Sequence, residues 1–203
     1  MSRSETIKLT AADLMQREEY DAQRKEFRTQ VMEYKRNRML ALGPSLTLSF
    51  ENRHTIRYQV QETLRLEKAL EPGRIQAELD AFNPLIPDGS NWKASCFVDV
   101  AAGKKADEPK RRAALARLRG VEHALWVQVA DLKKVKAVAD EDLDAAGEEG
   151  GPAVHFLRFE FDALQVAVLR AGAPVRFGVD HPEYRHEAVA PEALREALLA
   201  DLL

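Results

Sequence analysis

The side chains best suited to chemistry lie in one short stretch near the C-terminus, residues 178–187. Within this stretch, His181, Glu183 and His186 offer two imidazoles and a carboxylate, which are ligands that zinc, iron and manganese accept. The same groups transfer protons near neutral pH, so His181 or His186 could be a catalytic acid or base with Glu183 as its partner. The stretch also contains two candidate ligand-binding residues, Asp180 and Tyr184. The alternatives are an exposed turn with solvated charges and a buried histidine bonded to the backbone.

A second polar group follows one side of a helix predicted within residues 50–70. At helical spacing, His54, Tyr58, Gln61 and Arg65 fall opposite an apolar stripe, with Glu62 at the margin. A solvated helix face would more usually carry Lys and Glu without an aromatic residue. We therefore weigh two interpretations, a pocket wall and a face that packs under another element with its Arg and Glu side chains paired. The first interpretation makes ligand-binding residues of Arg57, Tyr58, Glu62 and Arg65, and makes Glu62 a second candidate partner for a catalytic histidine.

Two further residues whose side chains could take part in chemistry lie in predicted strands. The alternation of residues 153–161 places His155 on the same face as Leu157 and Phe159, so His155 is a candidate ligand-binding residue directed toward the same region. Cys96 lies in the middle of an apolar strand and is expected in the core rather than as a nucleophile. As the only cysteine of the chain, it excludes an internal disulfide and an iron–sulfur cluster supplied by this chain alone.

Sequence motifs narrow the classes of site. Two Glu-x-x-His pairs occur, Glu51 with His54 and Glu183 with His186. In di-iron helical bundles such pairs lie on inward-facing helices, whereas here they fall at a strand–helix junction and in a predicted loop. A mononuclear site that uses one pair is the more plausible metal centre. The sequence has no dinucleotide fingerprint, P-loop, nucleophile elbow or HExxH motif.

Composition limits the cellular context. The 203 residues are 45% hydrophobic and carry a net charge of −3, which is enough for a core but gives no electrostatic footprint for nucleic acid. No apolar run is long enough to span a membrane, and the first ten residues lack the apolar segment of a secretory signal. Together with the single cysteine, these features predict a cytoplasmic protein that binds neither nucleic acid nor membrane.

The order of predicted elements indicates an α+β domain that spans residues 1–203. Residues 1–42 are expected to form a helical arm or cap, with a long helix over residues 17–39, and residues 43–203 a body that contains a sheet. The sheet is expected to be mainly antiparallel, with strands near residues 46–50, 92–100, 125–130, 135–139, 153–161 and 174–179. Helices cover this sheet in the predicted arrangement, and the sequence leaves a homodimer through the N-terminal helices open.

Four stretches carry a resemblance to a known family: TIRYQVQETLR (55–65), NPLIPDGSN (83–91), AVHFLRFEF (153–161) and GVDHPEY (178–184). Over nearly the whole chain, the sequence resembles the bacterial family DUF3501, a domain of unknown function. The family supplies no catalytic residues. The resemblance implies an accessory role in a redox or peroxide-handling system, beside a rubrerythrin-like protein or an iron–sulfur oxidoreductase subunit as partner.

These observations lead to three hypotheses. The first is a cytoplasmic accessory or ligand-binding protein of a redox system, with a polar pocket between the stripe of residues 54–65 and the stretch of residues 180–186. The second is an enzyme, metal-dependent or acid–base, that acts on a small anionic substrate. The third is a structural module that docks another protein through the polar stripe. A pocket that joins the two segments would favour the first two hypotheses, and a flat exposed stripe would favour the third.

Overall fold

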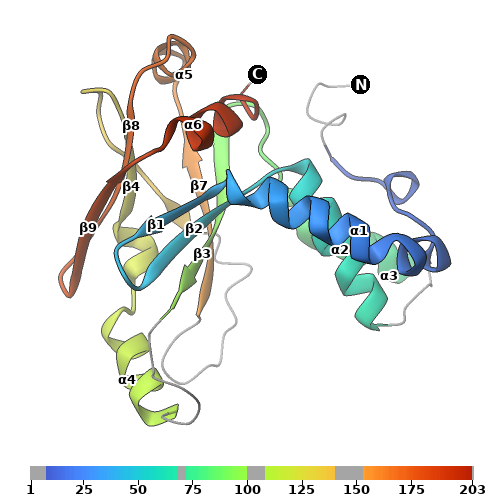
Figure 1. Ribbon diagram of the computed structural model, residues 1–203. Helices are drawn as coiled ribbons and strands as arrows, with labels where there is room; N and C mark the ends of the chain where they lie inside the picture. The colour runs from blue at the N-terminus through green and yellow to red at the C-terminus, as the bar shows by residue number, and fades with distance from the viewer. Residues whose placement is uncertain (1–7, 68–71, 100–107, 140–152, 203) are drawn as a thin grey trace.

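The computed structural model describes residues 8–67, 72–99, 108–139 and 153–202, and these residues form an α+β fold. Two antiparallel sheets face each other, and a layer of helices lies beside them (Figure 1). The first sheet has five strands in the order β1 (Met39–Leu42), β2 (Leu46–Glu51), β3 (Asn91–Val98), β7 (Val154–Glu160) and β6 (Val138–Ala139). The second has four, in the order β5 (Val135–Lys136), β4 (Leu125–Val129), β8 (Val175–His181) and β9 (Tyr184–Val189).

The two sheets meet at both edges. At one edge the chain passes from β5 to β6 through Ala137, whose N–H donates to the carbonyl of Leu125. At the other edge the Tyr184 hydroxyl donates to the carbonyl of Leu42 in β1 and accepts from the N–H of Ser45. The sheets therefore enclose one apolar core between them, in the manner of a flattened barrel.

Alternation along the strands fills this core. In β7 the buried side chains are His155, Leu157 and Phe159, as the sequence pattern predicts. Large aromatic rings from both sheets meet in the interior, with Phe177 of β8 centred 5.2 Å from Phe50 of β2. Because each strand contributes every second side chain inward, the opposite residues remain free to contact helices or solvent.

Helices cover the outside and the ends of the sheets. Beside the first sheet lie α1 (Arg17–Arg36), α2 (Arg53–Glu67) and α3 (Pro72–Phe82), which share their own small apolar clusters (Figure 1). The remaining helices are α4 (Glu108–Arg117), α5 (Ala163–Arg170) and α6 (Glu192–Leu199). Three short 3-10 helices are η1 (Ala11–Asp13), η2 (Asn83–Leu85) and η3 (Val121–Ala124). As the spacing predicts, Leu194, Leu198 and Leu202 bury their side chains where the C-terminal segment docks.

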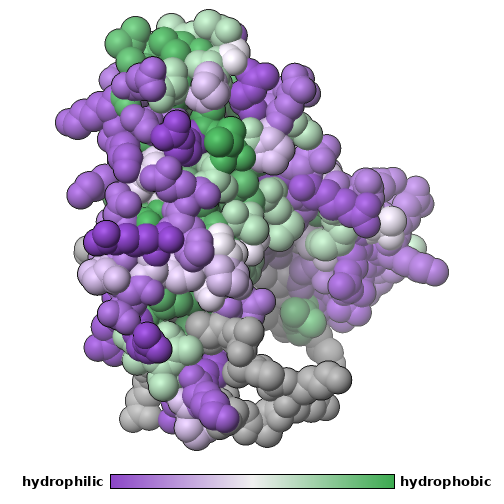
Figure 2. All heavy atoms as spheres, turned by 60° about the vertical axis from the view of Figure 1, so that its left-hand side comes forward, coloured by the Kyte–Doolittle hydropathy of each residue, from purple (hydrophilic) through white to green (hydrophobic). Residues whose placement is uncertain are grey.

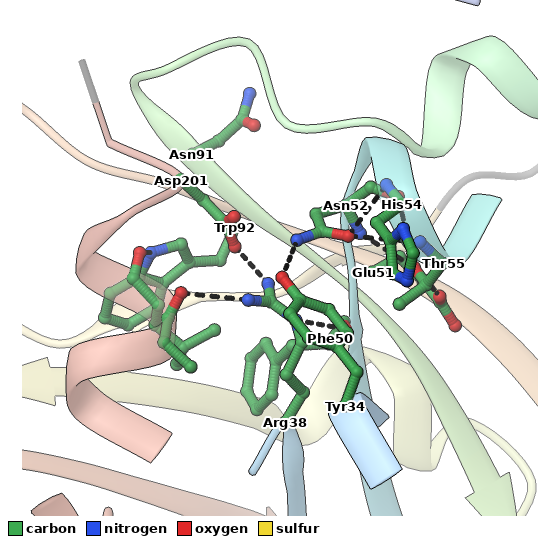
Figure 3. A network of polar contacts seen from close by, with 12 residues as sticks. Tyr34, Arg38, Phe50, Glu51, Asn52, His54, Thr55, Asn91, Trp92 and Asp201 are labelled. Atoms are coloured by element: carbon green, nitrogen blue, oxygen red, sulfur yellow. Dashed lines mark hydrogen bonds and ion pairs between the residues drawn. The ribbon is translucent and has the colours of Figure 1, made fainter. Parts of the chain in front are cut away.

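A buried polar network holds that C-terminal segment in place (Figure 3). Arg38 has 1% of its side chain exposed and pairs with Asp201, whose side chain is 8% exposed. The same guanidinium donates to the carbonyl of Phe50 at 3.0 Å and to that of Ala197 at 2.9 Å. The Trp92 indole N–H donates to the carbonyl of Leu198 at 3.0 Å. One cation thereby joins the end of α1, strand β2 and helix α6.

The structure differs from the sequence-based expectations in three places. Residues 39–42 were expected to belong to the helical arm, but they form β1, because Asn37 ends α1 and the buried Leu40 and Leu42 alternate inward. Strand β9 replaces part of the expected loop after residue 179. The expected single sheet is two sheets, since residues 135–139 divide between them at Ala137. Among the described residues, no helix combines the length and the apolar character needed to cross a membrane.

Candidate functional site

The histidine-rich stretch forms the β8–β9 hairpin rather than a loop that projects over a pocket. His181 pairs with Tyr184 at the end of the hairpin, so that only Pro182 and Glu183 make the turn. Seen from the side of β8 and β9, the surface is mainly hydrophilic, with apolar side chains gathered at the height of α5 (Figure 2). The hairpin therefore displays its outward side chains to solvent and turns His181 toward the interior, where it is 8% exposed.

Each candidate residue of the hairpin contacts other parts of the chain. His181 Nε2 lies 3.1 Å from the carbonyl of Arg119, and the N–H of Glu183 donates to His181 Nδ1 at 3.2 Å. The Glu183 carboxylate pairs with Arg117 at 3.1 Å, and Asp180 pairs with Lys134 at 3.4 Å. These contacts join the hairpin to α4 and to the segment before β5. Both ring nitrogens of His181 are engaged within the chain.

His186 lies apart from this group. Its ring contacts that of Tyr184 in a tilted arrangement, with centroids 4.5 Å apart, and closely approaches Gly43 in the β1–β2 turn. Within the described ranges, no three His, Cys, Asp or Glu side chains are grouped as metal ligands would be. A metal ion held by His181, Glu183 and His186 stays a prediction, as does an acid or base role for these residues.

The polar stripe of α2 is covered by α1. The Glu62 carboxylate receives two hydrogen bonds from Arg24, at 2.8 and 2.7 Å, and one from the Tyr20 hydroxyl at 2.6 Å. Arg65 donates to Asp21 of α1 at 2.9 Å. The hydrogen bonds from Arg24 hold the pKa of Glu62 below its ordinary value. The stripe thus has the paired Arg and Glu side chains that packing under another element requires.

The other two predicted ligand-binding residues of α2, Tyr58 and Arg57, also contact α1. Tyr58 packs against the apolar cluster of Tyr20, Phe27 and Val31, and the Arg57 guanidinium lies 5.8 Å from the centre of the Phe27 ring. Helices α1 and α2 lie on one side of the molecule, and strand β9 lies on the other (Figure 1). The expected pocket between the stripe and the hairpin is therefore wrong, because α1 packs on the stripe where the hairpin was expected.

The Glu62 contacts make the α1–α2 pair sensitive to acid. The depressed pKa means that the stabilisation is complete above the ordinary pKa of a glutamate and is lost as the pH falls through the lower folded value. We expect Glu62→Gln to lower the free energy of unfolding by about 1–2 kcal/mol at neutral pH. The difference from the wild type should shrink below about pH 4. Urea unfolding at several pH values tests this, with the exposed Glu33→Gln as control, which should change little at any pH.

A cavity of about 70 Å³ lies where α4 and η3 meet the end of β3 and the start of β7. Its apolar lining comes from Val98, Leu115 and Leu118. Its polar lining comes from Glu122 of η3 and His155 of β7, and the residues Arg119 and Gly120 at the α4–η3 corner complete it. Gly120 has φ +84°, a left-handed conformation that allows the chain to turn sharply from α4 into η3. This turn brings Glu122 over the strand that carries His155.

Glu122 and His155 form a buried pair with unsatisfied atoms. Glu122 Oε2 lies 3.7 Å from His155 Nδ1, beyond hydrogen-bond distance, and their side chains are 13% and 7% exposed. Neither of these two atoms has a hydrogen-bond partner. Buried polar atoms are nearly always satisfied in folded proteins, so an exception at the wall of a cavity is a candidate binding site. An imidazole and a carboxylate together can accept, donate or move a proton.

Cys96 is adjacent to this pair but is not an activated nucleophile. It lies directly opposite His155 in the β3–β7 register and is fully buried. Burial, followed by the nearby charge of Glu122, raises the pKa of the Cys96 thiol to about 12. The thiol therefore stays protonated at neutral pH, which matches its expected role in the core.

The thiol provides a simple test of that assignment. Because the thiolate is the reactive form, we expect native protein at pH 8 to resist iodoacetamide for hours, and unfolded protein in urea to react at the rate of a free cysteine. Mass spectrometry of the alkylated protein measures both rates. Rapid alkylation of the native protein would contradict the buried, neutral thiol.

Of these two residues, only His155 was a candidate from the sequence. The alternation of residues 153–161 predicted the face on which it lies, whereas Glu122 was not singled out. Glu122 lies in η3 between a glycine and a strand, and no motif marks it among the 33 acidic residues. The only local signal is Gly120, which indicates a turn but not the direction of the side chain that follows it.

A second hollow lies between η1, α1, α2 and α3. It has a volume of about 60 Å³, and its walls include Leu14, Leu64 and Ile75. Among its polar lining residues, Gln61 accepts from the backbone N–H of Met15 and donates to the carbonyl of the same residue. No lining residue of this hollow has a buried side-chain atom without a hydrogen-bond partner, in contrast to the Glu122–His155 cavity.

A solved structure and a family model each match most of the chain. The chain is similar to a protein of unknown function from Burkholderia pseudomallei K96243, whose crystal structure matches with 42% identity and a TM-score of 0.89. That match covers 97% of this chain and 100% of the other. A search of curated proteins finds no match. The family model for a protein of unknown function (DUF3501) matches residues 8–202, and the chain therefore belongs to the DUF3501 family.

Proposed function

We propose that this chain binds a small molecule with an N–H or O–H donor in the cavity between α4, η3, β3 and β7. One observation carries the proposal: His155 Nδ1 and Glu122 Oε2 face each other at 3.7 Å and are both buried without a hydrogen-bond partner. An unsatisfied buried polar atom costs about 1–3 kcal/mol. A ligand group placed between these atoms would recover that cost, and this gain supports binding.

The two polar groups restrict the chemistry of the ligand. An ionised Glu122 carboxylate only accepts hydrogen bonds, and His155 Nδ1 donates or accepts according to its tautomer. A hydroxyl satisfies both by donating to Glu122 and accepting from His155, and a protonated amine donates to both. An anion at the same point would be repelled by Glu122. The apolar side chains of Leu115 and Leu118 favour a short alkyl group beside the polar one.

The size of the cavity restricts the ligand further. A volume of about 70 Å³ exceeds what one water molecule needs by several-fold. The ligand is therefore a molecule of a few non-hydrogen atoms, such as a short alcohol or amine. For so few atoms the free energy of binding is limited to about −1.5 kcal/mol per atom at best, so for probes of two or three atoms we expect dissociation constants in the millimolar range.

Titration by nuclear magnetic resonance tests this proposal. We expect methylammonium and ethanol to shift the amide resonances of Gly120 and Glu122, and acetate to leave them unchanged. Glu122→Gln should weaken methylammonium binding about 10-fold to 100-fold, because a charge-assisted hydrogen bond is lost. Leu118→Phe, which fills the cavity, should abolish binding of both probes. Equal affinity in the wild type and both variants, or no shifts with either donor probe, would refute the proposal.

Within this proposal the chain is a cytoplasmic ligand-binding accessory protein. With a single cysteine the chain lacks the cysteines to be an electron carrier itself, so a redox role would need a bound partner, metal or small substrate. The resemblance predicts a rubrerythrin-like protein or an iron–sulfur subunit as that partner. Co-purification of this chain with each candidate, with and without the cavity probe, tests the association separately from ligand binding.

The same two side chains favour acid–base catalysis as a second candidate function. A carboxylate beside an imidazole is an arrangement that enzymes use to hold a proton in place for transfer. Glu122 would hold the bound donor group by a hydrogen bond, and His155 Nδ1 would accept a proton from that group. Replacement of His155 by Gln distinguishes the two functions, because it can keep a hydrogen bond to the ligand but removes the base.

A further inference from the structure

We infer that His181 is the positioning residue of the Glu122–His155 cavity, because it holds in place the corner between α4 and η3 that leads directly to Glu122. The inference rests on the proposed binding function and adds to it the residue that holds the site in shape. His181 lies at the end of β8 and lines no part of the cavity itself. It acts through the main chain of Arg119, which does line the cavity.

The hydrogen bonds of His181 define its tautomer. Nδ1 accepts the N–H of Glu183 at 3.2 Å, so the proton of a neutral ring must lie on Nε2. Nε2–H then donates to the carbonyl of Arg119 at 3.1 Å. The imidazole thus bridges the β8–β9 turn and the C-terminal end of α4, and each of its nitrogens has a hydrogen-bond partner.

The corner that this bridge holds is also anchored locally, by the buried side chains of Leu118 and Val121 and by the hydrogen bond from the Val121 N–H to the Leu118 carbonyl. Gly120, the residue between α4 and η3, has φ +84°, so the direction of the chain changes at a single position. A second contact with the hairpin, between Arg117 and Glu183, joins two side chains that are 73% and 52% exposed. Exposed ion pairs contribute little. The buried His181 bond is therefore the main polar restraint that the hairpin places on the corner, and Glu122 follows two residues after Gly120.

Three variants separate positioning from general stability. His181→Phe keeps a ring but loses both hydrogen bonds, whereas the His181→Gln amide can still donate to Arg119 and accept from Glu183. Val175→Ala is the matched control, because it weakens the opposite end of the same strand. Methylammonium affinity is one readout. The other is the rate constant at which methyl methanethiosulfonate labels Cys96, which reports opening of this end of the barrel and needs no ligand.

We expect His181→Phe to accelerate Cys96 labelling and to weaken methylammonium binding, each about 10-fold, since one or two buried hydrogen bonds are lost. His181→Gln should restore most of both values. The inference is overturned if His181→Phe matches the wild type, or if Val175→Ala accelerates labelling equally at the same loss of stability. A third outcome is that only His181→Phe accelerates Cys96 labelling, while neither the wild type nor any variant binds methylammonium. In that case His181 holds the corner as inferred, but the proposed binding function is wrong.

Discussion

Replacement of Arg38 by Met is expected to lower the free energy of unfolding by about 3–5 kcal/mol, because it leaves the buried Asp201 carboxylate without its cation. The carbonyls of Phe50 and Ala197 lose a donor in the same step. In a chain of this size the loss corresponds to a fall in melting temperature of about 6–20 °C. Urea unfolding followed by circular dichroism measures the change.

The double variant Arg38→Met/Asp201→Leu provides the critical comparison. Burial raises the pKa of Asp201 despite the nearby guanidinium, so the carboxylate carries a desolvation cost that its removal relieves. We expect the double variant to be more stable than Arg38→Met alone. Arg36→Met, which removes an exposed cation two residues earlier in the chain, should cost less than about 0.5 kcal/mol. A loss below about 1 kcal/mol for Arg38→Met would contradict the role assigned to this network.

The second large effect is expected at Gly178 of β8. A methyl group at this position would collide with the indole ring of Trp126, which lies directly opposite on β4 and is 3% exposed. The ring has the Lys134 ammonium 3.4 Å from its centre, so it cannot move aside without loss of that contact. We expect Gly178→Ala to cost about 3 kcal/mol, measured by chemical unfolding.

Two comparisons isolate the collision as the cause. Trp126→Leu in the Gly178→Ala background should recover part of the loss, because the smaller side chain leaves room for the methyl group. Gly73→Ala in α3, where an added methyl group meets no atom within 4 Å, should be neutral or stabilising by up to about 1 kcal/mol. If both glycine variants behave alike, backbone entropy rather than the Trp126 ring accounts for the effect.

The sequence predicted most of the elements because their patterns are local. The alternation of residues 153–161 and the Leu194–Leu198–Leu202 spacing each require one buried face, and the structure confirms both. Strand β9 was missed because its residues are almost all exposed, so no apolar alternation marks it. Its pairing depends on β8 and on the tight turn at Pro182 and Glu183, and such pairing cannot be read from β9 alone.

The candidate site was harder to predict for a different reason. His181, Glu183 and His186 are the residues with the most suitable chemistry, but tertiary contacts give His181 and Glu183 partners in and beside α4. The α2 stripe was ambiguous, because an aromatic residue beside Arg and Glu occurs both in pockets and under a packed helix. The Glu122–His155 pair joins residues 33 positions apart in sequence. Only the fold, through the turn at Gly120, brings them together.

A crystal structure of the protein soaked in methylammonium chloride tests the central claim most directly. We expect electron density for the probe between Glu122 Oε2 and His155 Nδ1, within hydrogen-bond distance of both atoms, and no such density in crystals of Glu122→Gln. A direct hydrogen bond between the two side chains, with the probe excluded from the cavity, would contradict the proposed binding site.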